Sequence, residues 1–111
     1  RLKVINAEND DDNHEGILRR YWTLQGPVFL PKSLVAKYGD IKTIFIEELK
    51  DPQTQEQIPV VADFLRSFWE GYEHITTNVS LLNISREPNN EDVWNVTIKI
   101  EAIVNIESMH D

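Results

Sequence analysis

The last part of the chain, residues 93–106, alternates regularly between apolar and polar side chains. One side of this segment would carry seven apolar residues: Trp94, Val96, Ile98, Ile100, Ala102, Val104 and Ile106. The other side would carry Asn95, Thr97, Lys99, Glu101 and Asn105. A period of two residues is typical of a β-strand that is buried on one side. The pattern therefore predicts a long strand in a sheet whose apolar face is covered by another layer.

The length of this strand has a second consequence. At ~3.3 Å per residue it would exceed ~40 Å, so we expect it to bend or to carry a β-bulge partway. An earlier segment, residues 76–85, shows the same alternation. Between the two lie residues 87–92, which are polar and rich in turn formers. The two segments are therefore predicted to form an antiparallel hairpin.

Apolar residues at intervals of three and four predict helices elsewhere in the chain. The clearest helix follows Pro59, where the apolar stripe would consist of Val61, Phe64 or Leu65, Phe68 and Tyr72. Two shorter helices are expected over residues 17–24 and 31–38. The β-branched and aromatic residues of segment 41–46 predict a further strand.

The resulting element order, ααβαββ, is that of an α+β domain. Two short helices and one longer helix would pack on one face of a curved antiparallel sheet. At the level of the fold, this arrangement is similar to cystatin-like proteins and to the cone-shaped proteins of the nuclear-transport-factor type. No residue motif identifies a family, and such folds carry enzymes, binding proteins and assembly modules alike.

Composition divides the chain into two unequal parts. Residues 1–14 include the acidic and polar run 8–13, so we expect a mobile acidic arm there. Residues 15–111 are predicted to form a single domain, because a chain of 111 residues that is 41% hydrophobic has enough material for one core. Since the chain begins at Arg1 rather than at Met, we expect it to be a fragment of a longer protein.

The residue types that the chain lacks argue against several kinds of chemistry. The absence of cysteine removes thiol nucleophiles and thiolate zinc sites. The chain has only 4 glycines, and no glycine-rich loop that could hold a phosphate. A net charge of −8 and scattered basic residues argue against nucleic acid as a ligand. We therefore expect no cofactor and no nucleic-acid partner.

Two acidic patterns have some of the residues of a metal site. Asp11 could begin a calcium-binding loop, but the twelfth position of that loop is Trp22, where a bidentate glutamate is needed. Asp40, Glu48 and Lys50 have the residue types of a magnesium-dependent nuclease site. Asp40, however, is predicted on the same strand as the other two. We therefore predict no metal site.

Three Asn-x-Ser/Thr sequences, at Asn78, Asn83 and Asn95, leave a glycosylated secreted protein as one interpretation. Strands that alternate apolar residues with Asn, Ser and Thr also generate this pattern. No apolar run approaches the ~20 residues of a membrane span, so we expect no membrane insertion. The cellular location stays open, since the cytoplasm and a bacterial extracytoplasmic compartment both fit the sequence.

The absence of a dense catalytic signature favours a non-catalytic protein-interaction or assembly module. The C-terminal strand would be the last in the sheet, and an uncovered strand edge is a template for pairing. We therefore expect this edge to bind a partner protein or a second copy of the chain. The predicted partner-binding residues are Trp69, Val93, Asn95, Thr97, Lys99 and Ile103.

The alternative function is a small cone-shaped enzyme or ligand-binding protein. In that case Asp63, Glu73 or His74 would act as an acid or a base in an apolar pocket. The two functions predict different interiors. An apolar cavity with a carboxylate at its base would favour the enzyme over the interaction module.

Overall fold

The computed structural model describes residues 2–12, 14–36, 41–68 and 75–105. The strands in this part of the chain are β1 (Lys3–Asn9), β2 (Ile17–Phe29), β3 (Ile75–Arg86) and β4 (Val93–Asn105). The helical segments are α1 (Lys32–Val35), α2 (Ile41–Thr43), the π-helical turn η1 (Ile44–Glu48) and α3 (Val60–Phe68). The chain is elongated and measures 51 × 25 × 22 Å.

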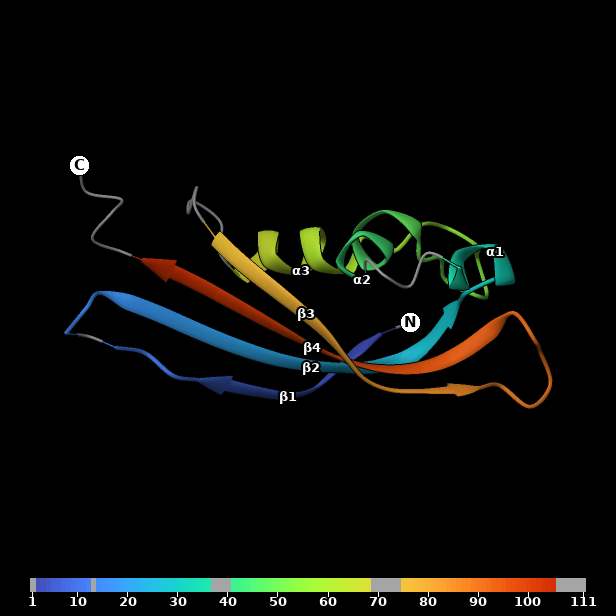
Figure 1. The fold of residues 1–111 in the computed structure, drawn as a ribbon, viewed down its shortest axis with the longest axis horizontal. Coiled ribbons are helices and arrows are strands. Elements are labelled where there is room, and N and C mark those ends of the chain that lie inside the picture. The colour runs from blue at the N-terminus through green and yellow to red at the C-terminus, as the bar shows by residue number, and fades with distance from the viewer. Residues whose placement is uncertain (1, 13, 37–40, 69–74, 106–111) are drawn as a thin grey trace.

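The strands form one antiparallel sheet in the order β1-β2-β4-β3. β4 pairs with β2 from Ile17↔Asn105 to Phe29↔Val93, and it pairs with β3 on its other side. The helical segments lie over one face of this sheet (Figure 1). In this strand order β1 and β3 are the edge strands of the described sheet. The face of the sheet opposite the helices is called the open face below.

The core lies between the sheet and the helical layer. Its largest single contribution comes from β4, where Val96, Ile98, Ile100, Ala102 and Val104 are at most 1% exposed. The Trp22 side chain of β2 faces the same space and meets the Phe64 ring of α3 edge-on, with 5.0 Å between ring centres. The predicted facing of the C-terminal strand is confirmed.

The predicted element order ααβαββ is wrong, because the chain begins with two strands instead of two helices. The similarity to cystatin-like and cone-shaped proteins depended on that order and is wrong with it. Among the described residues only α3 is a helix of more than one or two turns. The protein is mostly sheet, with four antiparallel strands and a layer of short helical segments.

The first of the predicted helices is instead the start of β2. Trp22, Leu24 and Val28 occupy the covered side of this strand and are at most 5% exposed. Two other positions on that side hold Arg20 and Gly26, which hide the alternation in the sequence. When the apolar residues of both faces are read together, Leu18, Tyr21, Trp22 and Leu24 recur at intervals of three and four, as in a helix. Pairing with β4 decides the conformation. The extended segment forms a backbone ladder along the whole of β4, and it still buries Trp22, Leu24 and Val28.

Pro27 lies within β2 at a place where a proline is tolerated. β1 pairs with β2 only as far as Gln25, so the outer side of β2 has no β1 partner beyond that residue. The Phe29 N–H points to this side and donates to the Lys50 carbonyl at 2.9 Å. The nitrogen of Pro27, two residues earlier, lies on the same side. Its missing N–H therefore removes no hydrogen bond from the β2–β4 ladder.

The strand predicted over residues 41–46 is helical in the structure. α2 continues into η1, which is closed by a hydrogen bond of 3.1 Å from the Leu49 N–H to the Ile44 carbonyl. Ile44, Phe45 and Leu49 are at most 2% exposed. A short run of β-branched and aromatic residues suits either a strand or a buried helical turn. The segment is a helical turn because this conformation buries all three side chains against the sheet.

Most of the predicted N-terminal arm is strand β1. It pairs with β2 from Lys3↔Gln25 to Asn9↔Arg20, with a register shift between Val4 and Asn6. All of its side chains are exposed. A strand that buries no side chain needs no apolar periodicity in its sequence. The sheet therefore includes residues that were predicted to lie outside the domain.

The predicted C-terminal hairpin is confirmed. β3 and β4 are joined by a turn in which the Glu87 N–H donates to the Val93 carbonyl at 2.9 Å. The expected irregularity lies in the partner strand, since the register shifts between Leu81 and Asn83 of β3. Leu82 is thus the extra residue of a bulge, and 55% of its surface is exposed.

Candidate functional site

β4 is not the sheet edge that the sequence predicted. β2 and β3 flank it on both sides (Figure 1), so pairing of a partner with its edge is wrong. On the open face of this interior strand lie Asn95, Thr97, Lys99 and Ile103. Val93 is buried, and Trp69 lies outside the described residues. A role of the open-face residues in binding a partner stays a prediction.

The open face carries a shallow polar pocket of about 230 Å³ around Tyr21. The Lys99 ammonium lies 4.8 Å from the centre of the Tyr21 ring. The Asn78 amide donates to the Glu101 carboxylate at 2.8 Å. Burial, and then a hydrogen bond with Glu101, raise the pKa of Tyr21. These contacts link β2, β4 and β3, so cross-strand pairing within the sheet accounts for the residues.

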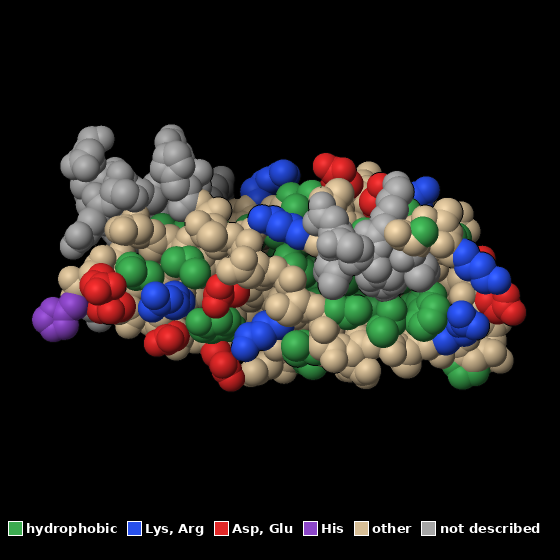
Figure 2. Space-filling model, in the orientation of Figure 1, with side chains coloured by type: hydrophobic (Ala, Val, Ile, Leu, Met, Phe, Trp, Pro, Cys, Tyr) green, Lys and Arg blue, Asp and Glu red, His purple; other side chains and the backbone are tan. Residues whose placement is uncertain are grey.

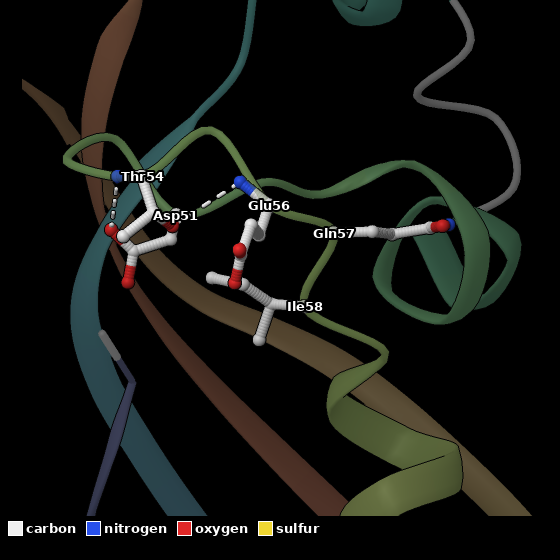
Figure 3. Close-up of a pocket in the computed structure, with 5 residues that line it drawn as sticks. All are labelled: Asp51, Thr54, Glu56, Gln57 and Ile58. Carbon is white, nitrogen blue, oxygen red and sulfur yellow. Dashed lines mark hydrogen bonds between the residues drawn. The ribbon is translucent and has the colours of Figure 1, made fainter.

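A second pocket, of about 100 Å³, lies in the loop between η1 and α3 (Figure 3). The Asp51 carboxylate accepts hydrogen bonds from the Gln53 N–H at 2.8 Å and the Thr54 N–H at 3.3 Å. The Thr54 hydroxyl accepts one from the Glu56 N–H at 3.2 Å (Figure 3). Gln55 completes the turn with a φ of 57°. The pocket is thus the inside of a tight polar turn.

A third pocket, of about 250 Å³, lies between the start of β1 and α3. Leu2, Leu24 and Phe64 contribute apolar surface to it, and Asp63 contributes a carboxylate. The Asp63 side chain is 58% exposed and lies 3.6 Å from the Arg66 guanidinium. This carboxylate therefore meets solvent at the rim, whereas the enzyme alternative requires one at an apolar base. The other two acid–base candidates, Glu73 and His74, lie outside the described residues.

Asp11 and Asp12 hold the turn between β1 and β2. The Asp12 carboxylate accepts a hydrogen bond from the His14 N–H at 3.1 Å. The Asp11 carboxylate accepts one from the Arg19 N–H at 3.1 Å and forms an ion pair with Arg20. Within the described ranges, no three His, Asp or Glu side chains gather in a group that could hold a metal ion. These hydrogen bonds and the ion pair assign both carboxylates a structural role in the hairpin.

Arg20→Gln should raise the pKa of Asp11. The side-chain hydrogen bond from Arg20 is the largest of the effects that hold this pKa below its ordinary value of 3.8. Because the folded pKa is the lower one, the pair stabilises the fold above pH 3.8 and loses this contribution as the pH falls through the folded value. A carboxyl titration by NMR measures the change. Arg86→Gln, at the far hairpin, is the control and should leave the Asp11 titration where it is.

The residues of the nuclease-like pattern do not meet at the end of a strand. The segment expected to be that strand is helical, and Glu48 is the last residue of η1. The Lys50 backbone bridges to Phe29 and to Gln57. Asp40 lies outside the described residues. The structure therefore gives this pattern no geometry of a metal-dependent active site.

The three Asn-x-Ser/Thr sequences start on the open face of the sheet. Asn78 and Asn83 are exposed on β3, and Asn95 of β4 donates to the Glu87 carboxylate at 3.0 Å. The middle residues of the three sequences pack toward the core: Val79, Ile84 and Val96. Alternation in a sheet that is buried on one face is therefore enough to produce the pattern.

The outer edge of β3 is the feature that the sequence reasoning missed. β3 pairs with β4 alone among the described strands, and residues 75–85 contain no charged side chain although the chain has a net charge of −8. Side chains of both signs are interspersed on the side of the molecule seen in Figure 2. β1, the opposite edge, is shorter and carries Lys3 and Glu8. The uncharged run in β3 was the available signal, because proteins commonly place charges on edge strands to prevent pairing.

Alternate peptide groups of β3 point to this outer edge. The Thr77 carbonyl accepts a hydrogen bond of 3.3 Å from the Lys42 ammonium of α2. The Val93 carbonyl accepts the Glu87 N–H, so the odd-numbered residues of β4 direct their backbone groups toward β3. The β3 partners of those residues are Thr76, Asn78 and Ser80, and their backbone N–H and C=O groups therefore point inward, toward β4. The backbone groups that point outward, to the outer edge, belong to Ile75, Thr77, Val79 and Leu81.

No family model, curated protein or solved structure with which we compared the chain matches it. Among the described residues, no helix is long and apolar enough to span a membrane. The geometry of the sheet is therefore the basis for an inference about function.

Proposed function

We propose that this chain is a non-catalytic protein-interaction module that binds an extended segment of a partner as an additional strand at the outer edge of β3. The observation that carries the proposal is the uncharged edge formed by residues 75–85. Unpaired N–H and C=O groups along a sheet edge form a template for another strand. Strand addition is a recurring way of recognising peptides, and main-chain hydrogen bonds supply its affinity.

The side chains that flank the edge supply its specificity. On the covered side, Ile75, Val79 and Leu81 are half-buried against the core. On the open side, Thr76, Asn78 and Ser80 are exposed. An incoming strand that alternates apolar residues with small polar ones would match both sides. We therefore expect an alternating, uncharged partner segment.

Thr77→Pro is expected to weaken binding of such a segment at least tenfold, because it removes an outward N–H from the edge. Since this N–H points away from β4, the β3–β4 ladder should stay intact. Suitable probes are peptides selected from a displayed random library on the immobilised chain. Their affinities for the wild type and the variant are measured by fluorescence anisotropy.

Thr77→Val is the matched control. It keeps the backbone N–H and the branched shape of the side chain, so it should bind the selected peptides as the wild type does. Thermal melting of both variants checks that the sheet is intact. The proposal is wrong if the library yields no binding peptide, or if the selected peptides bind a folded Thr77→Pro variant with unchanged affinity.

A further inference from the structure

We infer that a second copy of this chain occupies the edge, through antiparallel pairing of β3 with β3 about a two-fold axis at Asn78. The inference rests on the proposed function and names its partner. The pairing would join two sheets into one of twice as many strands. The covered faces of both copies would lie on the same side of the joined sheet.

The regular part of β3 is symmetric about Asn78. It runs from Ile75, the first residue of the strand, to Leu81, where the register shifts. A two-fold axis at Asn78 places Ile75 opposite Leu81 of the second copy, and Thr77 opposite Val79 of the second copy. All four residues point their backbone groups outward, so each pair is a hydrogen-bonded pair of an antiparallel ladder. The axis therefore uses every outward peptide group between the strand start and the bulge.

The side chains are self-complementary in this register. On the covered side, aliphatic Ile75 meets Leu81 and branched Thr77 meets Val79. On the open side, Thr76 meets Ser80 and Asn78 meets its own copy. No charged side chain of β3 lies in the paired segment, so like charges are not placed opposite each other even though both copies are acidic.

Two effects oppose the dimer and make it testable: repulsion between the acidic copies, and competition of Lys42 for a backbone carbonyl of the edge. Each copy has a net charge of −8, so long-range repulsion should weaken association at low salt. Lys42 lies at the edge and donates to the Thr77 carbonyl, a bond that the Val79 N–H of the second copy would replace. A lysine at a sheet edge is a common protection against pairing. We therefore expect added salt to strengthen the dimer several-fold. Lys42→Ala should strengthen it several-fold in high salt, where the additional negative charge of that variant is screened.

Charged substitutions at Thr76 and Ser80 test the register. These residues are a non-hydrogen-bonded pair across the axis, with Cα atoms about 4.5 Å apart. The chain with T76E and S80E should dimerise about tenfold or more weakly than the wild type, because acidic side chains face each other twice. The chain with T76K and S80K should do the same. An equal mixture of the two should form a mixed dimer, because opposite charges then meet at both positions.

Sedimentation equilibrium of the full chain measures these associations, and thermal melting confirms that each variant is folded. The expected result is a wild-type dimer at high micromolar concentration, two monomeric variants and a dimeric mixture. The inference is overturned by a monomeric wild type, by folded variants that dimerise like the wild type, or by a mixture that stays monomeric. Weaker association on adding salt also contradicts it, since that result indicates a basic partner surface.

The experiments distinguish failure of this inference from failure of the proposed function. If selected peptides bind in a manner that depends on Thr77 while the wild type stays monomeric, β3 accepts strands but not its own copy. If Thr77→Pro leaves peptide binding unchanged, strand addition at β3 is wrong and the dimer is wrong with it. Dimerisation that persists in Thr77→Pro and in both charge variants would place the contact elsewhere on the molecule.

Discussion

Ile98→Asp should lower the free energy of unfolding by several kcal/mol. Ile98 is fully buried, and it pairs with Leu24 of β2 and Leu81 of β3 in the middle of the sheet. The aspartate would be unpaired in the core, where an isolated charge is costly and drives either protonation or unfolding. Since small domains are stable by only ~5–15 kcal/mol, the loss would be a large part of the total. Urea denaturation followed by circular dichroism measures it.

Thr97→Asp is the matched control, because it introduces the same side chain one residue earlier on the opposite face. Thr97 is half-buried, and its hydroxyl accepts a hydrogen bond from the Gln25 amide at 3.0 Å. A carboxylate at this place keeps an acceptor near that amide and meets solvent. We expect a change of no more than about 1 kcal/mol. Equal losses in the two variants would show that the facing of β4 is wrong.

Phe45→Ala should lower the free energy of unfolding by about 3–5 kcal/mol, the usual range for removing a buried phenylalanine ring. Phe45 is 2% exposed and is the largest fully buried side chain of the helical layer. Its removal leaves a cavity between η1 and the sheet that neighbouring side chains fill only in part. The measurement is again urea denaturation, with the slope checked for a two-state transition.

Glu47→Ala is the control for this variant, because Glu47 lies in the same π-helical turn and is exposed. It should change the free energy of unfolding by no more than about 0.5 kcal/mol. The pair of variants also tests the conformation of the segment. In a strand over residues 41–46, Ile44 and Phe45 would point to opposite faces. A loss at Ile44→Ala that is small beside a large loss at Phe45→Ala would favour that strand over the turn.

Local periodicity in the sequence was sufficient to predict the strands β4 and β3 and the helix α3. In β4 every second residue from Trp94 to Val104 is apolar, and only a strand brings all of them to one face. In α3 the stripe that contains Val61 and Leu65 has helical spacing, and both residues are buried. These elements could be predicted because the chain itself carries the full pattern. The pattern also gave the direction of the core, since the apolar side of each element is the buried one.

Local periodicity failed where tertiary contacts complete the pattern. Arg20 and Gly26 interrupt the apolar side of β2, and only the ladder with β4 makes that segment extended along its whole length. Ile44 and Phe45 suit a strand by propensity, yet they are buried side by side in a helical turn. β1 has no buried side chain, and backbone pairing with β2 is what makes it a strand. Propensity is a weak preference that such long-range contacts override.

The sequence by itself determined which side of the C-terminal strand faces the core, and it also determined that residues 75–85 are uncharged. Only the tertiary structure decided which strand is the edge. Strand order depends on the pairing of β2 with β4, between residues far apart in the chain, and an interior strand has the same alternating pattern as an edge strand when one face of the sheet is open. The edge at which a partner strand could pair is therefore that of β3 and not that of β4. Backbone hydrogen bonds set the order of the strands, and they leave no signature in the side chains.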